Sequence, residues 1–419
     1  MATPQLVDGS TEGPVEITGP LRRLMFWTTP ANIAMFAVWG AVLAVLLPIQ
    51  VEAFDPDRKE INLAIVTSIG AVFAMLAQPV AGAISDRTRS RFGLRTPWIG
   101  GAAVLGFFAF VGLALADTLV WATVAWCAVQ TVYNFAQGPL SAILPDRVPR
   151  AVRGRFAALI GLGMMVGTVL GQGSATLFAD SVGLGYVVLA ALVAVVLVAF
   201  VVANPEPSTA AAPGAPFVVV DFLRTFWVNP RRHPDFGWAF LSRLCLYTGF
   251  NIVMTYQLYL LQDYIGLTRS EAVGLVPVVG LVSVAGILIG TLTTGPASDR
   301  IGRRKAFVVA GAFVVAVAMV IPWLWATVGG IIGFGFVVGL GYGVFQAVDT
   351  ALMSEVLPSS DSFAKDLGVV NIAQVLPQTI APAVAGAVVV GFSYAALFPV
   401  AIAFALAGGI TVLPIRSVR

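Results

Sequence analysis

Two formal charges interrupt long apolar stretches of this sequence: Arg243 within 236–261 and Asp349 within 328–353. A charge removed from water is costly unless it is paired, so these opposite charges predict an ion pair or a water-bridged contact. A carboxylate held by one cation can also take up a proton when the pair is disturbed. The pair therefore has two interpretations, a fixed structural contact or a proton-coupling site.

A second group of charges is concentrated in residues 82–97, GAISDRTRSRFGLRTP. Its beginning recurs as GPASDRIGRR at 295–304, with an offset of 213 residues that matches Gly82, Ser85, Asp86 and Arg87 to Gly295, Ser298, Asp299 and Arg300. Leu144–Pro145 and Leu357–Pro358 have the same offset, which indicates a duplicated unit. Such charges at helix ends can bind neighbouring helices together or can simply fix membrane topology.

Amide and aromatic side chains within the apolar stretches could bind a neutral polyol, because amides meet hydroxyl groups and flat rings stack on the apolar faces of a sugar. Tyr133, Asn134 and Gln137 share one face of a helix by their spacing, and Trp126 falls close to that face. Hydrogen bonding between packed helices is the alternative role for such groups.

The elements that position these residues must be apolar helices. Of the 419 residues, 58% are hydrophobic and 11% charged, and the mean hydropathy is +0.91, whereas a soluble domain carries about 25% charged residues. We therefore expect an all-α integral membrane protein with twelve transmembrane helices in two pseudo-symmetric six-helix bundles. The spans expected to cross a hydrocarbon core of about 30 Å are 31–49, 61–84, 97–116, 119–144, 156–179, 183–203, 236–261, 272–294, 306–326, 328–353, 367–389 and 391–413.

The lysines and arginines predict the orientation of these spans. With the N-terminus inside, 20 of the 24 lie in inner segments, three in outer segments and one, Arg243, within a span, which places both termini in the cytoplasm. Arg243 and Asp349 then lie at a similar depth, roughly 6–10 Å inside the membrane. The expected parts are a tail at 1–20, an N-terminal bundle at 21–203, a linker at 204–235, a C-terminal bundle at 236–413 and a tail at 414–419.

Two of these parts have a composition of their own. The N-terminal tail contains acids and prolines and has no signal-peptide pattern. The linker is rich in proline and alanine, and its amphipathic piece at 217–227 is expected to lie on the membrane surface.

Few residues could support chemistry other than transport. Cys127 and Cys245 lie in apolar stretches and His233 in a polar loop, so the sequence indicates neither a metal site nor a nucleophile with its base. No phosphate-binding GxxxxGK[ST] loop occurs. We expect no enzymatic activity, no cofactor and no nucleic-acid partner. The expected partners are a small-molecule substrate, a proton and the lipid bilayer, around a monomeric chain.

The repeated loop resembles the signature of the major facilitator superfamily, and the resemblance covers essentially the whole chain after residue 20. It implies that the loop latches the two halves when the transporter faces outward, through Gly82, Asp86, Arg87, Arg91, Asp299 and Arg300. It also implies that the first, fourth, seventh and tenth helices face a central cavity. The substrate-binding candidates on these helices and on the eleventh are Trp39, Trp126, Tyr133, Asn134, Gln137, Tyr247, Asn251, Tyr256, Gln257, Tyr342, Gln346, Asn371, Gln374 and Gln378.

Three segments resemble a narrower branch, the glycoside–pentoside–hexuronide cation symporters and sucrose-type carriers: SDRTRSRFGLRTPW at 85–98, YNFAQGPLSAILPDRVPRAVRGR at 133–155 and EVLPSSDSFAKDLGVVNIAQVLPQ at 355–378. That branch places cation-binding carboxylates in its first, second and fourth helices, but spans 31–49, 61–84 and 119–144 contain no Asp or Glu. Arg95-Thr96-Pro97 also departs from the branch's more basic Arg-Arg-Pro. A sodium site of that kind is therefore not expected.

The sequence predicts a proton-coupled secondary transporter for a small organic solute, with a sugar or glycoside as the first candidate. A proton-antiport exporter of drugs or other small organic compounds is the alternative. Exporters of the superfamily carry a Gly-Pro-rich motif in the fifth helix, and GLGMMVGTVLGQG at 161–173 lacks the proline.

Overall fold

The computed structural model describes residues 19–210, 233–356 and 363–417; side chains at 350, 354, 355, 363–371 and 374 are not described. These residues form helices joined by short turns, with no strand among them, so the all-α expectation is confirmed. Residues 1–18 of the predicted tail at 1–20, the amphipathic piece at 217–227 and residues 418–419 lie outside the described residues.

The N-terminal half consists of six helical segments in succession. Its first segment contains a π-helical turn, η1, and its second begins with a 3₁₀ turn, η2. The elements are α1 (Gly19–Ala41), η1 (Val42–Leu46), α2 (Leu47–Phe54), η2 (Pro56–Arg58), α3 (Lys59–Arg87), α4 (Thr96–Ala114), α5 (Leu119–Arg147), η3 (Arg150–Val152), α6 (Arg153–Ala175), η4 (Thr176–Phe178) and α7 (Val182–Ala203).

The C-terminal half repeats this order. Its first segment is bent by 49° between α9 and α10 and also contains a π-helical turn, η5. The elements are α9 (Pro234–Thr255), α10 (Gln257–Tyr259), η5 (Leu260–Tyr264), α11 (Arg269–Ile301), α12 (Arg304–Leu324), α13 (Val328–Val356), α14 (Phe363–Gly391), η7 (Tyr394–Ala396) and α15 (Leu397–Thr411).

The described helices have the length and composition of membrane spans. Ten are each long and apolar enough to cross a bilayer, and the bent segment from Pro234 to Tyr264 supplies an eleventh. The remaining long helix, α14, has a shorter apolar portion at Val375–Gly391. Large apolar side chains such as Leu105, Phe108 and Phe313 are exposed on the outside of the molecule, where lipid chains would cover them.

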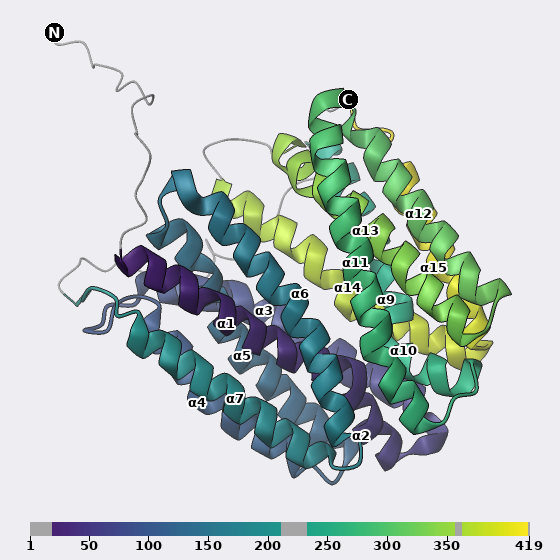
Figure 1. Ribbon diagram of the computed structural model, residues 1–419, viewed down its shortest axis with the longest axis horizontal. Coiled ribbons are helices and arrows are strands. Elements are labelled where there is room, and N and C mark those ends of the chain that lie inside the picture. The colour runs from purple at the N-terminus through teal and green to yellow at the C-terminus, as the bar shows by residue number, and fades with distance from the viewer. Residues whose placement is uncertain (1–18, 211–232, 357–362, 418–419) are drawn as a thin grey trace.

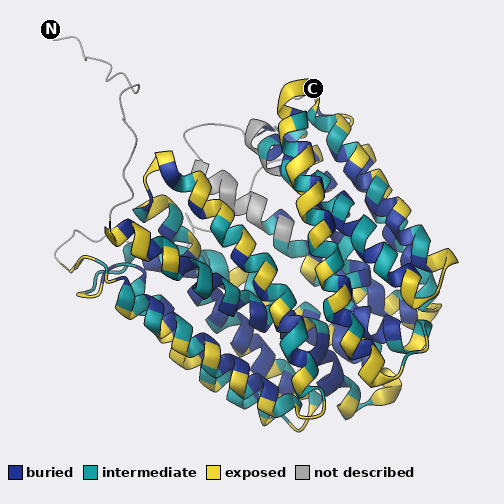
Figure 2. Ribbon diagram, viewed as in Figure 1, coloured by how far each residue is buried: buried dark blue, intermediate teal, exposed yellow. Residues whose placement is uncertain are grey.

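Glycines allow close packing within each half, because a side chain at these positions would meet the backbone of the neighbouring helix. On α6, Gly171 lies against the backbone of Ala37 on α1, and on α13, Gly339 lies against the backbone of Ser283 on α11. Figure 2 shows the resulting distribution, with buried residues along the inner faces of the helices and exposed residues facing outward.

The two halves lie side by side, the first coloured purple to teal and the second green to yellow (Figure 1). They meet along α3 and α14 and along α6 and α11. We call the end that carries the start of α1, the turn after α3 and the end of α15 the terminal end, and the end that carries η2, η5 and η7 the distal end. The helices α6 and α11 converge toward the distal end, where Gln172 lies against Gly280 (Figure 1).

Candidate functional site

Arg243 and Asp349 lie side by side in the C-terminal half. The Nε atom of Arg243 on α9 is 3.2 Å from Oδ2 of Asp349 on α13, and the two side chains are 7% and 5% exposed. They stand nine and seven residues from the terminal ends of their helices, which corresponds to a depth of roughly 10–14 Å. The structure therefore contains the expected ion pair, buried at matching depth; its part in proton coupling stays a prediction.

Aromatic rings surround this pair. The guanidinium carbon of Arg243 is 5.6 Å from the ring centre of Tyr247, within the range of a cation–π contact. The Tyr247 ring meets the rings of Tyr342 and Phe345 edge-on, at centroid distances of 5.6 and 5.7 Å, and Tyr342 also packs on Phe250. The rings exclude water, which strengthens the attraction within the pair.

Two amide side chains, Asn251 and Gln257, follow Tyr247 along α9 and α10. Asn251 donates to the carbonyl of Tyr247, a bond within its own helix. Gln257 lies directly after the bend at Tyr256 and is buried, and its Nε2 atom has no hydrogen-bond partner among the described residues. Tyr256 itself bonds across to the other half, donating to the carbonyl of Glu60.

The structure brings three of the N-terminal candidates together. Trp39 on α1 meets Trp126 and Tyr133 on α5 edge-on, at centroid distances of 5.9 and 6.0 Å. Tyr133 packs against Phe110 on α4, inside the bundle. Trp126 is fully buried, and no described residue accepts a hydrogen bond from its indole nitrogen, which lies beside Gly70.

The remaining polar candidates are more dispersed. Asn134 donates to the carbonyl of Gln130 and Gln137 donates to Ser141, both one turn away on α5. Gln346 on α13 and Gln378 on α14 are exposed. The side chains of Asn371 and Gln374 lie outside the described residues.

At the terminal end, Arg95 is the centre of a cluster of ion pairs. In the sequence, Arg95 was notable only because Arg95-Thr96-Pro97 departs from a family pattern. Its guanidinium group donates to Ser85, pairs with Asp86 at 2.5 Å and pairs with Asp146 at 2.8 Å. Arg95 is buried, with its side chain 7% exposed. We call Ser85, Asp86, Arg95 and Asp146 the Arg95 cluster; it joins α3, α4 and α5 of one half.

Three other members of the predicted latch, Gly82, Arg87 and Arg91, lie within five residues of Asp86 in the sequence. Arg87 donates to the carbonyl of Ala83, and Arg91 stacks on the ring of Phe92. Gly82 has open space beside it. In the second copy of the motif, Asp299 and Arg300 are both exposed. Latching of the halves by these residues stays a prediction.

The segment after α7 folds back onto the same loop. The carboxylate of Glu206 accepts hydrogen bonds from the backbone N–H groups of Arg95 and Thr96, at 2.8 and 3.2 Å, and so caps α4. The backbone N–H of Thr209 donates to Ser90, and the N–H of Ser90 donates to the Thr209 hydroxyl. The beginning of the predicted linker is therefore bound to the N-terminal half.

At the distal end, charged groups of both halves form what we call the distal network. Lys59 pairs with Glu52 at 2.9 Å and with Asp263 at 2.8 Å, and Arg269 pairs with Glu52 at 3.0 Å. The hydroxyl of Tyr394 contacts Glu60 at 2.7 Å and Asp263 at 2.9 Å. The network consists of Glu52, Lys59, Glu60, Asp263, Arg269 and Tyr394.

The distal network was not among the sites predicted from the sequence. The sequence contained one indication of it: Lys59 and Arg269 are two of only three basic residues in the predicted outer segments. Acids stand close to both of them in the sequence.

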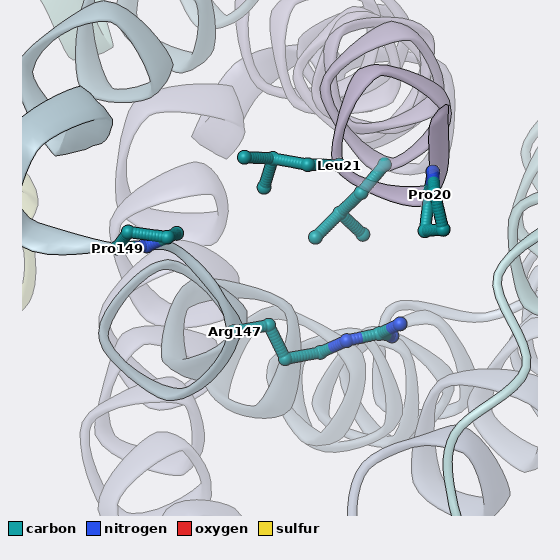
Figure 3. A pocket seen from close by; sticks show the side chains of 5 residues that line it. Pro20, Leu21, Arg147 and Pro149 are labelled. Carbon is teal, nitrogen blue, oxygen red and sulfur yellow. The ribbon is translucent and has the colours of Figure 1, made fainter. Parts of the chain in front are cut away.

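A small hollow at the terminal end of the N-terminal half contains none of the predicted site residues. It is lined by Pro20, Leu21, Leu24, Arg147 and Pro149, with the Arg147 side chain extending across it (Figure 3). Arg147 also donates to the carbonyl of Asn204 after α7. We assign this hollow no part in the site.

The family model of the Major Facilitator Superfamily matches residues 28–293 and 239–418. The chain belongs to this superfamily. The expected fold, two bundles of six transmembrane helices, is thereby confirmed, and transport rather than catalysis is the activity of the superfamily.

Individual relatives agree with this membership. A 156-residue segment is 26% identical to the sucrose transport protein SUC4 of Arabidopsis thaliana; it covers 32% of this chain and only 30% of that protein's length. Among solved structures, the fold is similar to a bacterial homologue of the human lysosomal transporter Spinster in an inward-facing and occupied conformation. The TM-score is 0.75 at 14% identity, over 94% of this chain and 96% of that one.

Two further solved structures share the fold. One is a mutant of the nucleoside transporter NupG, with a TM-score of 0.75 at 13% identity over 94% of this chain and 99% of that one. The other is a D-xylose–proton symporter, with a TM-score of 0.70 at 15% identity over 95% and 98%. At these identities the structural likeness establishes the fold alone.

Proposed function

We propose that this chain is a secondary active transporter that moves a sugar or glycoside across the cytoplasmic membrane by alternating access, coupled to protons. The observation that carries the proposal is the Arg243–Asp349 pair, a buried ion pair enclosed by tyrosine rings in a membrane-spanning member of this superfamily. Ionisable groups inside membrane spans are costly, and they commonly mark substrate and proton pathways.

The orientation we propose places the terminal end in the cytoplasm. The basic residues within 87–95, 147–155 and 300–305 lie at this end, whereas the distal end carries Arg58, Lys59 and Arg269. This distribution follows the positive-inside rule. Because the distal network joins the two halves, the molecule is closed on the outside in this arrangement.

Two buried donors without an acceptor support a sugar as the substrate class. Buried donors are normally satisfied, yet the Trp126 indole and the Gln257 amide have no acceptor among the described residues. Hydroxyl and ring oxygens of a sugar are suitable acceptors, and aromatic rings such as Trp39 and Tyr342 can stack on its apolar faces. The sucrose transport protein and the xylose–proton symporter named above support the same class by analogy.

In the proposed mechanism, Asp349 is the proton carrier. Substrate binding or a closing helix disturbs its pair with Arg243, and the carboxylate then takes up a proton because an unpaired charge is unstable in this buried position. Restoring the pair releases the proton. Substrate and proton thus cross the membrane in the same cycle.

Proteoliposomes loaded with the pH indicator pyranine test the proposal. A panel of sugars and lipophilic cations is added outside and internal pH is followed; internal acidification on addition of one sugar is the expected result. A response only to lipophilic cations would favour the exporter, and no response to any sugar would contradict the proposal.

The variant Asp349→Asn is expected to lose proton-linked accumulation at least tenfold while downhill exchange of the same solute persists. The double variant Arg243→Gln with Asp349→Asn is the matched control, because it removes the uncompensated charge that costs about 3–5 kcal/mol when one partner of a buried pair is lost. It is expected to fold better than either single variant. Full accumulation by Asp349→Asn would exclude this carboxylate as the coupling site.

A further inference from the structure

Two glycines of the C-terminal half lie where the halves meet toward the distal end. Among the glycines whose surroundings the structure describes, only Gly280 on α11 and Gly386 on α14 would place a Cβ atom within 3 Å of a residue of the other half. They belong to the two helix pairs that join the halves, α6 with α11 and α3 with α14. Each pair therefore approaches most closely at a residue that has no side chain.

The space beside Gly386 is closed from two sides. A Cβ atom at this position would lie 2.8 Å from the hydroxyl oxygen of Tyr256 and 2.9 Å from the Cβ atom of Ala64 on α3. Ordinary van der Waals contacts of a Cβ atom begin at 3.4 Å. A methyl group at position 386 therefore does not fit while α3 and α14 are in contact.

The neighbours of Gly386 are both held in place. The Cβ atom of Ala64 is fixed to the backbone of α3, and Ala64 is buried. The Tyr256 hydroxyl donates to the carbonyl of Glu60 at 2.7 Å, and its fully buried ring packs against Tyr259. An added methyl group must therefore separate α14 from α3 or break the hydrogen bond from Tyr256 to Glu60. Either change loosens the contact between the halves.

The backbone conformation of Gly386 does not require a glycine. Gly386 lies inside α14 and is not among the described glycines with positive φ. Alanine is the better helix former at such a position. Gly386 therefore weakens its own helix, and the close approach of Ala64 and Tyr256 is the physical reason for a residue without a side chain.

The contact at Gly280 is more adaptable. Its neighbour is the Oε1 atom of Gln172 on α6, which lies at the end of a flexible side chain. Gln172 is buried, and this oxygen accepts no hydrogen bond from any described residue. Turning it away therefore breaks no described hydrogen bond. The two glycines thus provide a comparison between a rigid contact at 386 and an adaptable one at 280.

We propose that Gly386 is the positioning residue that sets how closely the two halves approach at the distal end. This inference rests on the proposed alternating access. A side chain at 386 is overpacked in the closed state, and it is relieved when α14 moves away from α3. A larger residue therefore shifts the population toward molecules that are open at the distal end.

Spin labels across the distal end measure this shift. Ala53 on α2 and Ser270 on α11 are exposed, one in each half, and both are replaced by cysteine in the full chain after Cys127 and Cys245 are changed to alanine. Distance distributions from double electron–electron resonance, recorded in nanodiscs, give the closed and open populations. In Gly386→Ala the ratio of closed to open molecules is expected to fall by about tenfold, the size of effect that an overpacked methyl group produces.

Two other glycines serve as controls. Gly391 lies on the same helix with no other atom within 4 Å of its Cβ position, so Gly391→Ala is the matched control. Gly391→Ala and Gly280→Ala are both expected to stay within about twofold of the wild-type ratio. An unchanged ratio in Gly386→Ala would overturn the proposal. Shifts of equal size in Gly386→Ala and either control would overturn it as well.

Changes at Ala64 test the same contact from the other half. Adding Ala64→Gly to Gly386→Ala moves the methyl group from one helix to the other, and part of the closed population is expected to return. Ala64→Val alone enlarges the contact from the α3 side and is expected to open the distal end; it also keeps the test decisive if Gly386→Ala does not fold. No shift in Ala64→Val together with no recovery in the exchanged pair would overturn the proposal.

Transport assays separate this inference from the proposed function. A shift in the distance distribution of Gly386→Ala, in a chain that moves no sugar, would contradict the proposed substrate and leave the inference about closure standing. An unchanged distribution in Gly386→Ala, when the wild-type chain accumulates a sugar with protons, would overturn the inference about closure alone.

Discussion

The two ends of the molecule use arginine and lysine differently. At the terminal end, Arg95 is held by acids of its own half, and its cluster with Asp86 and Asp146 joins α3, α4 and α5. At the distal end, Lys59 and Arg269 pair with acids across the boundary between the halves. Similar ion pairs therefore stabilise one bundle at one end and the contact between bundles at the other. Under the proposed alternating access, only the second kind breaks when the halves separate at the distal end.

The two copies of the repeated motif sharpen this comparison. Both end a long helix with Ser-Asp-Arg, and both copies have the serine buried, as Ser85 and Ser298. The residue before the next helix is Arg95 in the first copy and Arg303 in the second; Arg95 is buried in its cluster, whereas Arg303 is exposed. The duplication preserved the motif, but the ion-pair cluster around Arg95 has no described counterpart around Arg303.

The largest effect is expected from Arg95→Gln. Loss of the guanidinium group removes charge-assisted bonds of about 1.5–3 kcal/mol each and leaves Asp86 near Asp146 with no shared cation. We expect unfolding in detergent to become easier by about 3 kcal/mol, measured as a lower thermal midpoint. The matched variant Arg303→Gln is expected to stay within about 0.5 kcal/mol of wild type. Equal losses of stability in the two variants would show that the two copies of the motif do not differ in their contribution to stability.

A conformational effect is expected from Lys59→Met. This change removes the pair that bridges to Asp263 and leaves Glu52 with Arg269. We expect the ratio of closed to open molecules at the distal end to fall about tenfold, which corresponds to about 1.4 kcal/mol. Distances between spin labels at the exposed positions Ala53 and Ser270, one in each half, provide the measurement. An unchanged distance distribution would place the closing contacts elsewhere, along α3 and α14 or α6 and α11.

The smallest effect is expected from Glu206→Gln. The amide can still accept one hydrogen bond from the N–H groups of Arg95 and Thr96, but it loses the charge that favours a helix N-terminus. We expect a loss of about 0.5–1 kcal/mol in thermal stability. The closed population at the distal end should not change, because Glu206 contacts one half only. A shift in that population would show that the segment after α7 is coupled to the contact between the halves at the distal end.

The sequence predicted what depends on composition and periodicity. Long apolar runs specify the helices, the 213-residue offset predicts the duplicated halves, and two opposite charges at equal depth predict the Arg243–Asp349 pair, since no other charge lies inside a span. Whether a side chain faces the cavity also depends on the rotation of its helix, and this was predicted less well. Tyr133 packs inside its own bundle against Phe110, where spacing along one helix cannot distinguish an inward face from a cavity face.

The Arg95 cluster and the distal network depend on the tertiary arrangement instead. Their members are far apart in the sequence: Arg95 meets Asp146, and Glu60 meets Tyr394. Charges in short links are ordinarily solvated, so their types alone do not indicate pairing. The distal pairs also exist only while the halves are closed at that end, and a sequence does not specify which state is populated.

The π-helical turns change the direction in which the following side chains point around the helix axis. In the turn at Val42–Leu46 the backbone hydrogen bonds join residues five apart, instead of the four of an α-helix. A second π turn, Leu260–Tyr264, lies in the corresponding helix of the second half. A π turn accommodates one surplus residue, and one residue is about 100° of rotation in a helix with 3.6 residues per turn. Beyond Leu46 the helix therefore presents a different azimuth, and it is in this rotated section that Glu52 faces Arg269 and Lys59. The first helix thus carries two sections of different orientation, one with Trp39 before the π turn and one with Glu52 after it.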